Sequence, residues 1–182
     1  MATTLTYSLF ETSLGWCGLT GTVDRIHGCL LPEDNPGYVR ARLSHRHPAA
    51  IEAPPGPVLQ RAVARIRSLI DGANDDLRDL PLEMSVVSPF ERAVYELARE
   101  ILPGQTTTYG EIAHALGDIL QSQSVGRALG RNPFAPIVPC HRVVAAGQKL
   151  GGFSATGGRA LKLRLLDVES RWARDDLFGR RA

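Results

Sequence analysis

The segment P-I-V-P-C-H-R-V-V places a thiol beside an imidazole, at Cys140 and His141. A free thiol has a pKa of about 8.5, and an imidazole can take its proton to leave a nucleophilic thiolate. Adjacent side chains of a strand point to opposite faces, but Pro139 favours a turn, where both groups can share a site directly or through one water. The imidazole then needs an orienting carboxylate, and Asp167 and Glu169 are the nearest downstream acids on a predicted helix. Most free cysteines are simply small buried hydrophobes, so the pair alone does not establish a site.

A longer pattern surrounds this pair. The run R-N-P-x-x-x-x-V-P-C-H-R-V-V is followed by G-G-F-S and then by K-x-x-L-L-x-x-E. Together these motifs resemble the O6-alkylguanine-DNA alkyltransferases, also called methylated-DNA–protein-cysteine methyltransferases. The resemblance is close over residues 86–169, where it includes T-Y-G-E-I-A. Over the first 85 residues it is limited to the general layout and to G-W-C-G at 15–18.

The resemblance implies a single-use repair reaction. In that family the cysteine attacks the alkyl carbon on guanine O6, guanine is restored, and the cysteine stays alkylated. Carried onto this chain, Cys140 is the acceptor, His141 is the water-linked base, and Glu169 orients the histidine. Asn132 matches the asparagine that braces the active-site turn. Tyr109 matches the tyrosine that crowds the 3′ phosphate of the target and faces the leaving guanine. No metal or other cofactor is implied.

The implied partner is alkylated double-stranded DNA, bound through its minor groove by a monomeric protein. A base inside a duplex cannot reach a buried thiol, so the O6-alkylguanine must be flipped out of the stack. The DNA-contacting residues carried over from the family are Tyr109, Gln123, Ser124, Arg127, Gly130 and Arg131. The substrate pocket carried over consists of Val143, Gly152, Phe153 and Ser154. Whether O4-alkylthymine is also a substrate stays open.

One position departs from the family pattern. The family usually has an arginine two residues before the V-G of the recognition helix, where it inserts into the duplex, and here that position is Gln123. Glutamine can pair with the orphaned base but brings no positive charge, which weakens duplex binding and its salt dependence. Gln123 is therefore either a working substitute, which we favour, or a sign that single strands or free modified bases are preferred.

Two other classes of function compete with alkyl transfer to DNA. The first is a helix-turn-helix module that senses alkylated bases and recruits repair factors. Relatives of that kind lack the acceptor cysteine, whereas this chain has Cys140. The second is a turnover enzyme that uses Cys140 and His141 on a thioester or another small electrophile.

The elements that must position these residues are predicted by periodicity and capping patterns. Ser88 and Pro89 begin a helix that ends near residue 102. Thr108 and Glu111 form a capping-box pattern for a second short helix. A third helix follows over residues 122–133, so a helix-turn-helix is expected. A glycine-rich loop then leads to a helix over 159–169 and a mobile tail from residue 172.

The N-terminal part is predicted to be a different kind of domain. Residues 1–31 indicate two or three antiparallel strands, 32–57 a long surface connection, 58–70 a helix and 81–87 another strand. We therefore expect an α/β domain over 1–85, a small antiparallel sheet with a helix. A mostly helical domain with a helix-turn-helix is expected over 86–182. By resemblance, the first domain is ribonuclease H-like and the second winged-helix-like.

Composition adds further bounds. Residues 1–84 carry eight arginines and ten acidic residues, a net charge of −2, while residues 85–182 carry a net charge of +4. The basic excess thus accompanies Cys140, which permits a polyanionic partner. No signal-peptide pattern or membrane-spanning run is present, which predicts a cytoplasmic protein. The cysteines and histidines of the N-terminal part match no compact zinc spacing, so no metal is expected; they are Cys17, His27, Cys29, His45 and His47.

Overall fold

A computed structural model describes residues 4–177 of the chain. Its N-terminal half contains a sheet in which the first three strands form an antiparallel meander, as the alternation predicted: β1 (Thr6–Thr12), β2 (Gly15–Gly21) and β3 (Ile26–Glu33). The short strand β4 (Ile51–Glu52) pairs with β1 in parallel, so the strand order is β3-β2-β1-β4. Gly15 has a φ of +128°, and a Cβ there would lie 2.7 Å from the Glu33 carbonyl oxygen, so the turn requires glycine.

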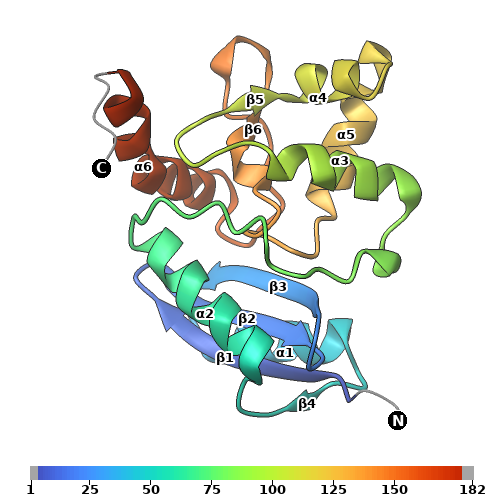
Figure 1. Cartoon of the computed structure of the whole chain (residues 1–182), viewed down its shortest axis with the longest axis vertical. Coiled ribbons are helices and arrows are strands. Elements are labelled where there is room, and N and C mark those ends of the chain that lie inside the picture. The colour runs from blue at the N-terminus through green and yellow to red at the C-terminus, as the bar shows by residue number, and fades with distance from the viewer. Residues whose placement is uncertain (1–3, 178–182) are drawn as a thin grey trace.

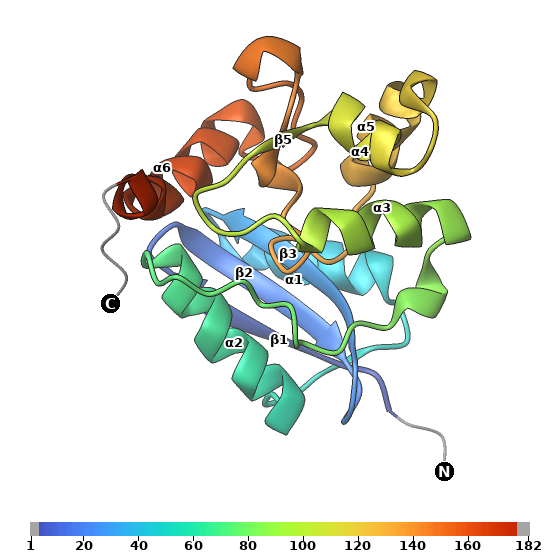
Figure 2. The same cartoon turned by 45° about the horizontal axis from the view of Figure 1, so that its top comes forward.

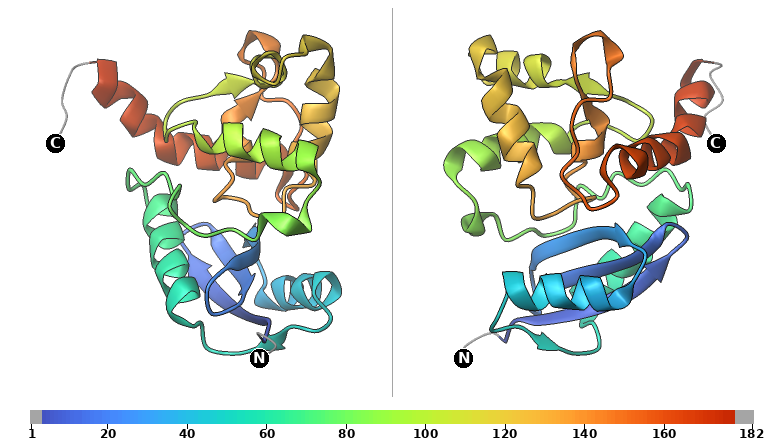
Figure 3. Two further views of the ribbon diagram at one scale, coloured as in Figure 1. Left: turned by 45° about the vertical axis from the view of Figure 1, so that its right-hand side comes forward. Right: turned by 180° about the vertical axis from the view of Figure 1, so that it is seen from behind.

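Helices cover both faces of this sheet (Figures 1 and 3). The helix α2 (Pro57–Ile70) confirms the prediction for residues 58–70 and buries one side against β1 and β2. On the opposite face, Val39 and Leu43 of α1 (Pro36–Arg46) pack against Tyr7 and Leu30. The prediction that residues 32–57 form a surface connection is therefore wrong. A helix forms there because the Asn35 side chain accepts a hydrogen bond from the Gly37 N–H and a proline occupies the first turn.

The connection between the two halves also differs from the prediction. Residues 81–87 do not form a strand: they contain the 3₁₀ turn η1 (Met84–Val86), and Leu82 makes a single bridge to Ile26. The reason is local, because the Glu83 side chain accepts a hydrogen bond from the Ser85 N–H and caps the turn.

The C-terminal half begins with three helices, as expected. Both α3 (Pro89–Arg99) and α4 (Tyr109–Ala115) start at complete capping boxes. The 3₁₀ turn η2 (Ile119–Gln121) leads into α5 (Ser122–Gly130), which packs on α4 in the predicted helix-turn-helix arrangement. Two short parallel strands, β5 (Thr107–Thr108) and β6 (Val143–Val144), lie beside these helices.

The chain then passes through the 3₁₀ turns η3 (Cys140–Arg142) and η4 (Ala146–Gln148) to the long helix α6 (Gly158–Leu177). A mobile tail from residue 172 was predicted, which is wrong for residues 172–177, because α6 continues through them. The Trp172 Nε1–H donates to the Gly72 carbonyl (3.1 Å) and holds this end of α6 to the N-terminal half. Residues 178–182 of that predicted tail lie outside the described residues.

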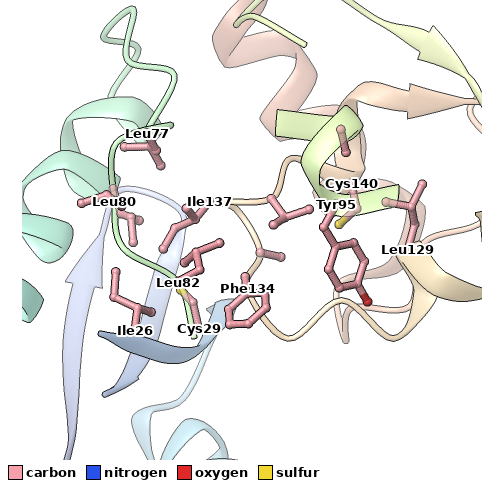
Figure 4. Packing of buried hydrophobic residues seen from close by; sticks show 14 of the residues in the cluster. Ile26, Cys29, Leu77, Leu80, Leu82, Tyr95, Leu129, Phe134, Ile137 and Cys140 are labelled. Atoms are coloured by element: carbon pink, nitrogen blue, oxygen red, sulfur yellow. The ribbon is translucent and has the colours of Figure 1, made fainter. Parts of the chain in front are cut away.

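A single hydrophobic cluster extends through both halves, from Phe10 to Leu165. Figure 4 shows Cys29 of β3 beside Phe134, and the Cys29 N–H donates to the Pro133 carbonyl (2.7 Å). Phe134 in turn meets the ring of Tyr95 edge-on at 6.3 Å. The segment before Cys140 therefore lies against the N-terminal sheet. Within the described residues, no helix is both long and apolar enough to cross a membrane.

Candidate active site

Cys140 lies at the start of a tight turn rather than in a strand, as the preceding proline predicted. Its N–H donates to the Val138 carbonyl (2.9 Å), and the Arg142 N–H donates to the Pro139 carbonyl (2.9 Å). The side chain is 8% exposed. The turn thus presents Cys140 and His141 from one short segment and keeps both of them largely out of solvent.

Glu169 connects this turn to the C-terminal helix α6. One of its carboxylate oxygens lies 2.9 Å from His141 Nε2 and 2.8 Å from Arg142 Nη2, and the other accepts from Arg142 Nε at 2.9 Å. All three side chains are at most 3% exposed. Burial would raise the pKa of Glu169, but the charges and hydrogen bonds of His141 and Arg142 bring it to about 2. Glu169 is therefore ionised at neutral pH.

This arrangement fixes the tautomer of His141. Burial lowers the pKa of His141 despite the opposing effect of Glu169, so the ring is neutral at pH 7. A neutral ring facing an ionised carboxylate donates its Nε2–H to that carboxylate. Nδ1 then carries a lone pair, and this buried atom has no hydrogen-bond partner among the described residues. His141 is consequently available as a proton acceptor at Nδ1.

Burial raises the pKa of the Cys140 thiol, but several groups around it favour the thiolate. The Asn132 side chain, the charge of Lys162 and backbone N–H groups all act in that direction. At the other two cysteines burial outweighs the opposing effects of Thr12 and Arg67 on Cys17 and of Arg46 on Cys29. Burial raises the pKa of Cys17 to about 12, and that of Cys29 is raised well above its ordinary value. Of the three thiols, Cys140 is the one equipped to react as a nucleophile.

Lys162 and Arg142 were not identified as site residues from the sequence. The Lys162 side chain is fully buried, and its Nζ donates to the Val143 carbonyl (2.7 Å). The same ammonium lies 5.9 Å from the ring centroid of Tyr109 and 5.8 Å from that of Phe153. Both residues belong to the quoted motifs, as the K of K-x-x-L-L-x-x-E and the R of P-C-H-R. Their positions can therefore be read from the motifs, whereas their burial cannot.

Asn132 braces the segment between α5 and the active-site turn. Its Nδ2 donates to the Val138 carbonyl (2.8 Å), and its Oδ1 accepts from the Phe134 N–H (2.9 Å). These two bonds close the loop that carries residues 132–138. The amide therefore sets the path of the chain that delivers the thiol.

A cavity of about 470 Å³ opens beside the thiol. Such a volume is in the range of small-molecule pockets, which is about 300–1,000 Å³. It is lined by Tyr109, Gly126, Leu129, Gly130, Cys140, Gly152, Phe153 and Ser154. The structure thus brings three of the four predicted pocket residues together with Tyr109 and Cys140. Val143 does not line this cavity, because its side chain is fully buried and its carbonyl is bound by Lys162.

Tyr109 is held between α5 and the glycine-rich loop. A Cβ at Gly126 would lie 3.8 Å from its ring, and a Cβ at Gly151 would lie 3.1 Å from its hydroxyl. Gly151 also has a φ of +70°, so a side chain there is disfavoured both by the backbone conformation and by the close contact with Tyr109. Burial raises the pKa of Tyr109, and nearby Cys140 raises it further, so the hydroxyl stays protonated and can donate.

The loop that follows is tied to both halves of the molecule. The Ser154 Oγ–H donates to the Gly130 carbonyl (2.7 Å). The Thr156 Oγ1–H donates to the buried carboxylate of Glu33 (2.9 Å), and Arg42 of α1 bonds to both of these groups. A smaller cavity of about 130 Å³ between the halves is lined by these residues and by Cys140. The N-terminal half therefore helps to fix the loop over the thiol.

The predicted DNA-contacting residues of α5 form its outer side. Gln123, Arg127 and Gly130 are exposed, while Val125, Ala128 and Leu129 face the core. The Arg127 guanidinium donates to Ser124 Oγ (2.9 Å), and Arg131 pairs loosely with Glu91 (3.3 Å). Gly130 has open space around its missing side chain. The outer side of α5 therefore carries one arginine within the helix and a second at its end.

Comparisons with known proteins agree with this geometry. Residues 89–171 match the family model described as the DNA-binding domain of 6-O-methylguanine DNA methyltransferase. A probable methylated-DNA–protein-cysteine methyltransferase of Acanthamoeba polyphaga mimivirus is 38% identical over 113 residues, which cover 62% of this chain and 73% of that protein.

The chain belongs to the O6-methylguanine-DNA methyltransferase family.

Two further comparisons extend the likeness. A DNA base-flipping protein of Thermus thermophilus is 40% identical over 121 residues, covering 64% of this chain and 80% of that protein. A Mycobacterium tuberculosis protein, OGT, has a crystal structure in complex with DNA. It superposes with a TM-score of 0.75 at 29% identity, covering 94% of this chain and 97% of that one. The mixed α/β architecture of the methyltransferase family thus spans both halves of this chain. Among the described residues, no group of three His, Cys, Asp or Glu side chains is arranged to hold a metal.

Proposed function

We propose that this protein is a methylated-DNA–[protein]-cysteine S-methyltransferase, a direct-reversal repair protein that acts once. Its substrate is O6-alkylguanine in double-stranded DNA, and Cys140 keeps the alkyl group. The observation that carries the proposal is the buried set of Cys140, His141 and Glu169, in which His141 Nδ1 has no hydrogen-bond partner within residues 4–177. Relatives named methylated-DNA–protein-cysteine methyltransferase support it.

The reaction follows from the protonation states. The Cys140 thiol gives its proton to His141 Nδ1, directly or through a water, and Glu169 stabilises the resulting imidazolium. The thiolate sulfur then attacks the alkyl carbon, a C–S bond forms, and the C–O6 bond breaks with its electron pair left on guanine. A proton from the Tyr109 hydroxyl neutralises the leaving guanine, and the proton held by His141 returns through water to the Tyr109 oxygen, so that both side chains end neutral. No group in the site restores the thiolate, so each molecule reacts once.

Several finer features belong to the same proposal. The lesion is flipped into the cavity beside Cys140, and α5 approaches the minor groove of the duplex as a monomer. Residues 1–85 form a domain, ribonuclease H-like, which is supported by the strand order β3-β2-β1-β4 with a parallel β4. Residues 86–182 form a winged-helix-like domain that binds DNA. A cytoplasmic location stays a prediction from the sequence.

The binding-module alternative is not favoured. The chain is similar to a base-flipping protein, but a module that only senses lesions has no use for an oriented histidine beside a cysteine. The turnover alternative is not favoured because an alkylated cysteine is a thioether, and its C–S bond is not cleaved by the hydroxyl groups or water that the site can offer.

The proposal is tested by mass spectrometry after incubation with a duplex that contains one O6-methylguanine. We expect one methyl group per protein molecule on the peptide that contains Cys140 and none on Cys17 or Cys29. Cys140→Ser should stay folded and unmodified. An unmodified Cys140 in folded wild-type protein, or more than one product per molecule, would overturn the proposal.

A further inference from the structure

The turn that precedes the recognition helix carries two exposed apolar side chains that neither the fold nor the site explains. Leu120 is 86% exposed, the highest value among the exposed large hydrophobic residues, and its neighbour Ile119 is 57% exposed. Figures 1 and 2 show this turn, between α4 and α5, at the outer edge of the C-terminal half. Isolated apolar residues on a surface are ordinary, so their placement and rigidity must decide what they do.

The turn is held in one conformation by its own hydrogen bonds. The Asp118 side chain accepts from the Leu120 N–H (2.9 Å), and the Asp118 carbonyl accepts from the Gln121 N–H (3.1 Å). The Asp118 N–H in turn donates to the Ala113 carbonyl (3.1 Å), which anchors the turn to α4. Gly117 has a φ of +91°, which permits the reversal. Leu120 is therefore presented on a rigid support.

Ile119 packs beside Gly110, the residue that follows Tyr109 in the chain. The Ile119 Cδ1 atom would lie 3.9 Å from a Cβ at Gly110, the residue next to Tyr109. Tyr109 lines the cavity beside Cys140. Along the chain, Leu120 precedes the exposed Gln123 by three residues and Arg127 by seven. Leu120 thus lies in the turn that leads directly into α5 and its exposed residues.

The beginning of α5, which follows this turn, carries little charge. The first turn of α5 reads S-Q-S and carries no charged side chain, and Arg127 lies in the last turn. Minor-groove proteins frequently insert Leu, Ile, Phe or Met between base steps, which unstacks and bends the duplex. An exposed leucine on a rigid turn meets that requirement.

We infer that Leu120 is an apolar wedge that enters the DNA stack next to the lesion, with Ile119 as its base against α4. In this protein the wedge, together with Gln123, takes on the task of keeping the extruded base out of the helix. The inference rests on the proposed function and assigns the residue that opens the duplex.

The test compares methyl transfer from a duplex and from a single strand that carry the same O6-methylguanine. A single strand has no partner strand to separate from, so it does not need the wedge. We expect Leu120→Ala to lower the transfer rate from the duplex about tenfold, because the lost apolar contact forms only in the opened duplex. The rate from the single strand should change less than about twofold. Leu120→Met, which keeps an apolar side chain of similar length, should restore the duplex rate.

A matched control and a second readout separate the wedge from other effects. Val23 is 70% exposed in the turn between β2 and β3, so Val23→Ala removes a comparable apolar surface from the N-terminal half and should leave both rates unchanged. At saturating protein, 2-aminopurine beside the lesion should brighten with the wild type and stay dim with Leu120→Ala.

The outcomes distinguish failure of the Leu120 wedge from failure of the proposed methyl transfer. Equal duplex rates for the wild type and Leu120→Ala, or an equal loss on both substrates, would overturn the wedge. An effect of Leu120→Ala only on association with another protein would do the same and assign the turn to a protein partner. If wild-type Cys140 stays unmodified on both substrates, the proposed function fails instead, while the 2-aminopurine signal still tests the wedge.

Discussion

Replacing Glu169 with glutamine tests the electrostatic basis of the site. The carboxylate is 3% exposed and has a pKa of about 2, against an ordinary value of 4.5. A depressed pKa means that the ionised form stabilises the folded state. This depression corresponds to roughly 3 kcal/mol, which is fully present above pH 4.5 and is lost as the pH falls toward 2. This value agrees with the cost of breaking a buried ion pair by removing one partner, which is about 3–5 kcal/mol.

Glutamine has the shape of the protonated acid, so the variant imitates wild-type protein at low pH. The assay is urea unfolding of both proteins at pH 7 and at pH 3.5. We expect the free energy of unfolding of Glu169→Gln to be about 3 kcal/mol lower at pH 7. At pH 3.5 this difference should shrink by about 1 kcal/mol or more, because the wild-type protein begins to lose the same contribution.

Glu100→Gln is the matched control. Glu100 also pairs with an arginine, Arg78, but its side chain is 67% exposed, so solvent screens the pair. The unfolding free energy of this variant should stay within about 0.5 kcal/mol of the wild type at both pH values. A difference below about 1 kcal/mol for Glu169→Gln at pH 7 would refute the reasoning. So would a difference that does not change between pH 7 and pH 3.5.

Three further predictions concern alkyl transfer. Because the pKa of His141 is lowered and that of Cys140 is raised, the transfer rate should be constant near neutral pH and fall below about pH 6.5; a decline that already begins at pH 7.5 would contradict this. Gln123→Arg adds a cation to the outer side of α5, so duplex affinity should rise and the slope of log K against log salt should steepen by about one; an unchanged salt slope would show that the position does not contact phosphate. Lys162→Met removes a charge that favours the thiolate, so alkylation of Cys140 by iodoacetamide should slow about tenfold while duplex binding measured by anisotropy is retained; equal reactivity would rule out that role.

The predictions that succeeded depend on local chemistry. The capping boxes at Ser88 and Thr108 set where α3 and α4 begin, because a side chain and a backbone N–H three residues apart determine the start of a helix. Pro139 likewise indicated a turn at Cys140. Such features need only a few consecutive residues, so they are readable from the sequence.

The failures depend on contacts between distant segments. The helix α1 was missed because only Val39 and Leu43 mark its buried side in a segment rich in Pro, His and Arg. The burial of Lys162 depends on rings contributed by other segments, so no local pattern reveals it. The bond between Glu33 and Thr156 joins residues that are more than a hundred positions apart. Tertiary packing therefore decides these features, and sequence periodicity does not report them.

The contact between β3 and Pro133 also bears on how the chain avoids aggregating. Because β3 is the outermost strand of the N-terminal sheet, its free edge would be a template for pairing with other chains. The Cys29 N–H is instead bound by the Pro133 carbonyl, and Cys29 bridges to Phe134. During synthesis the N-terminal half emerges from the ribosome before residues 133 and 134 exist, so this edge stays open until most of the chain has been made. The segment that carries Cys140 thus also covers the open edge of β3 and keeps it from pairing with other chains.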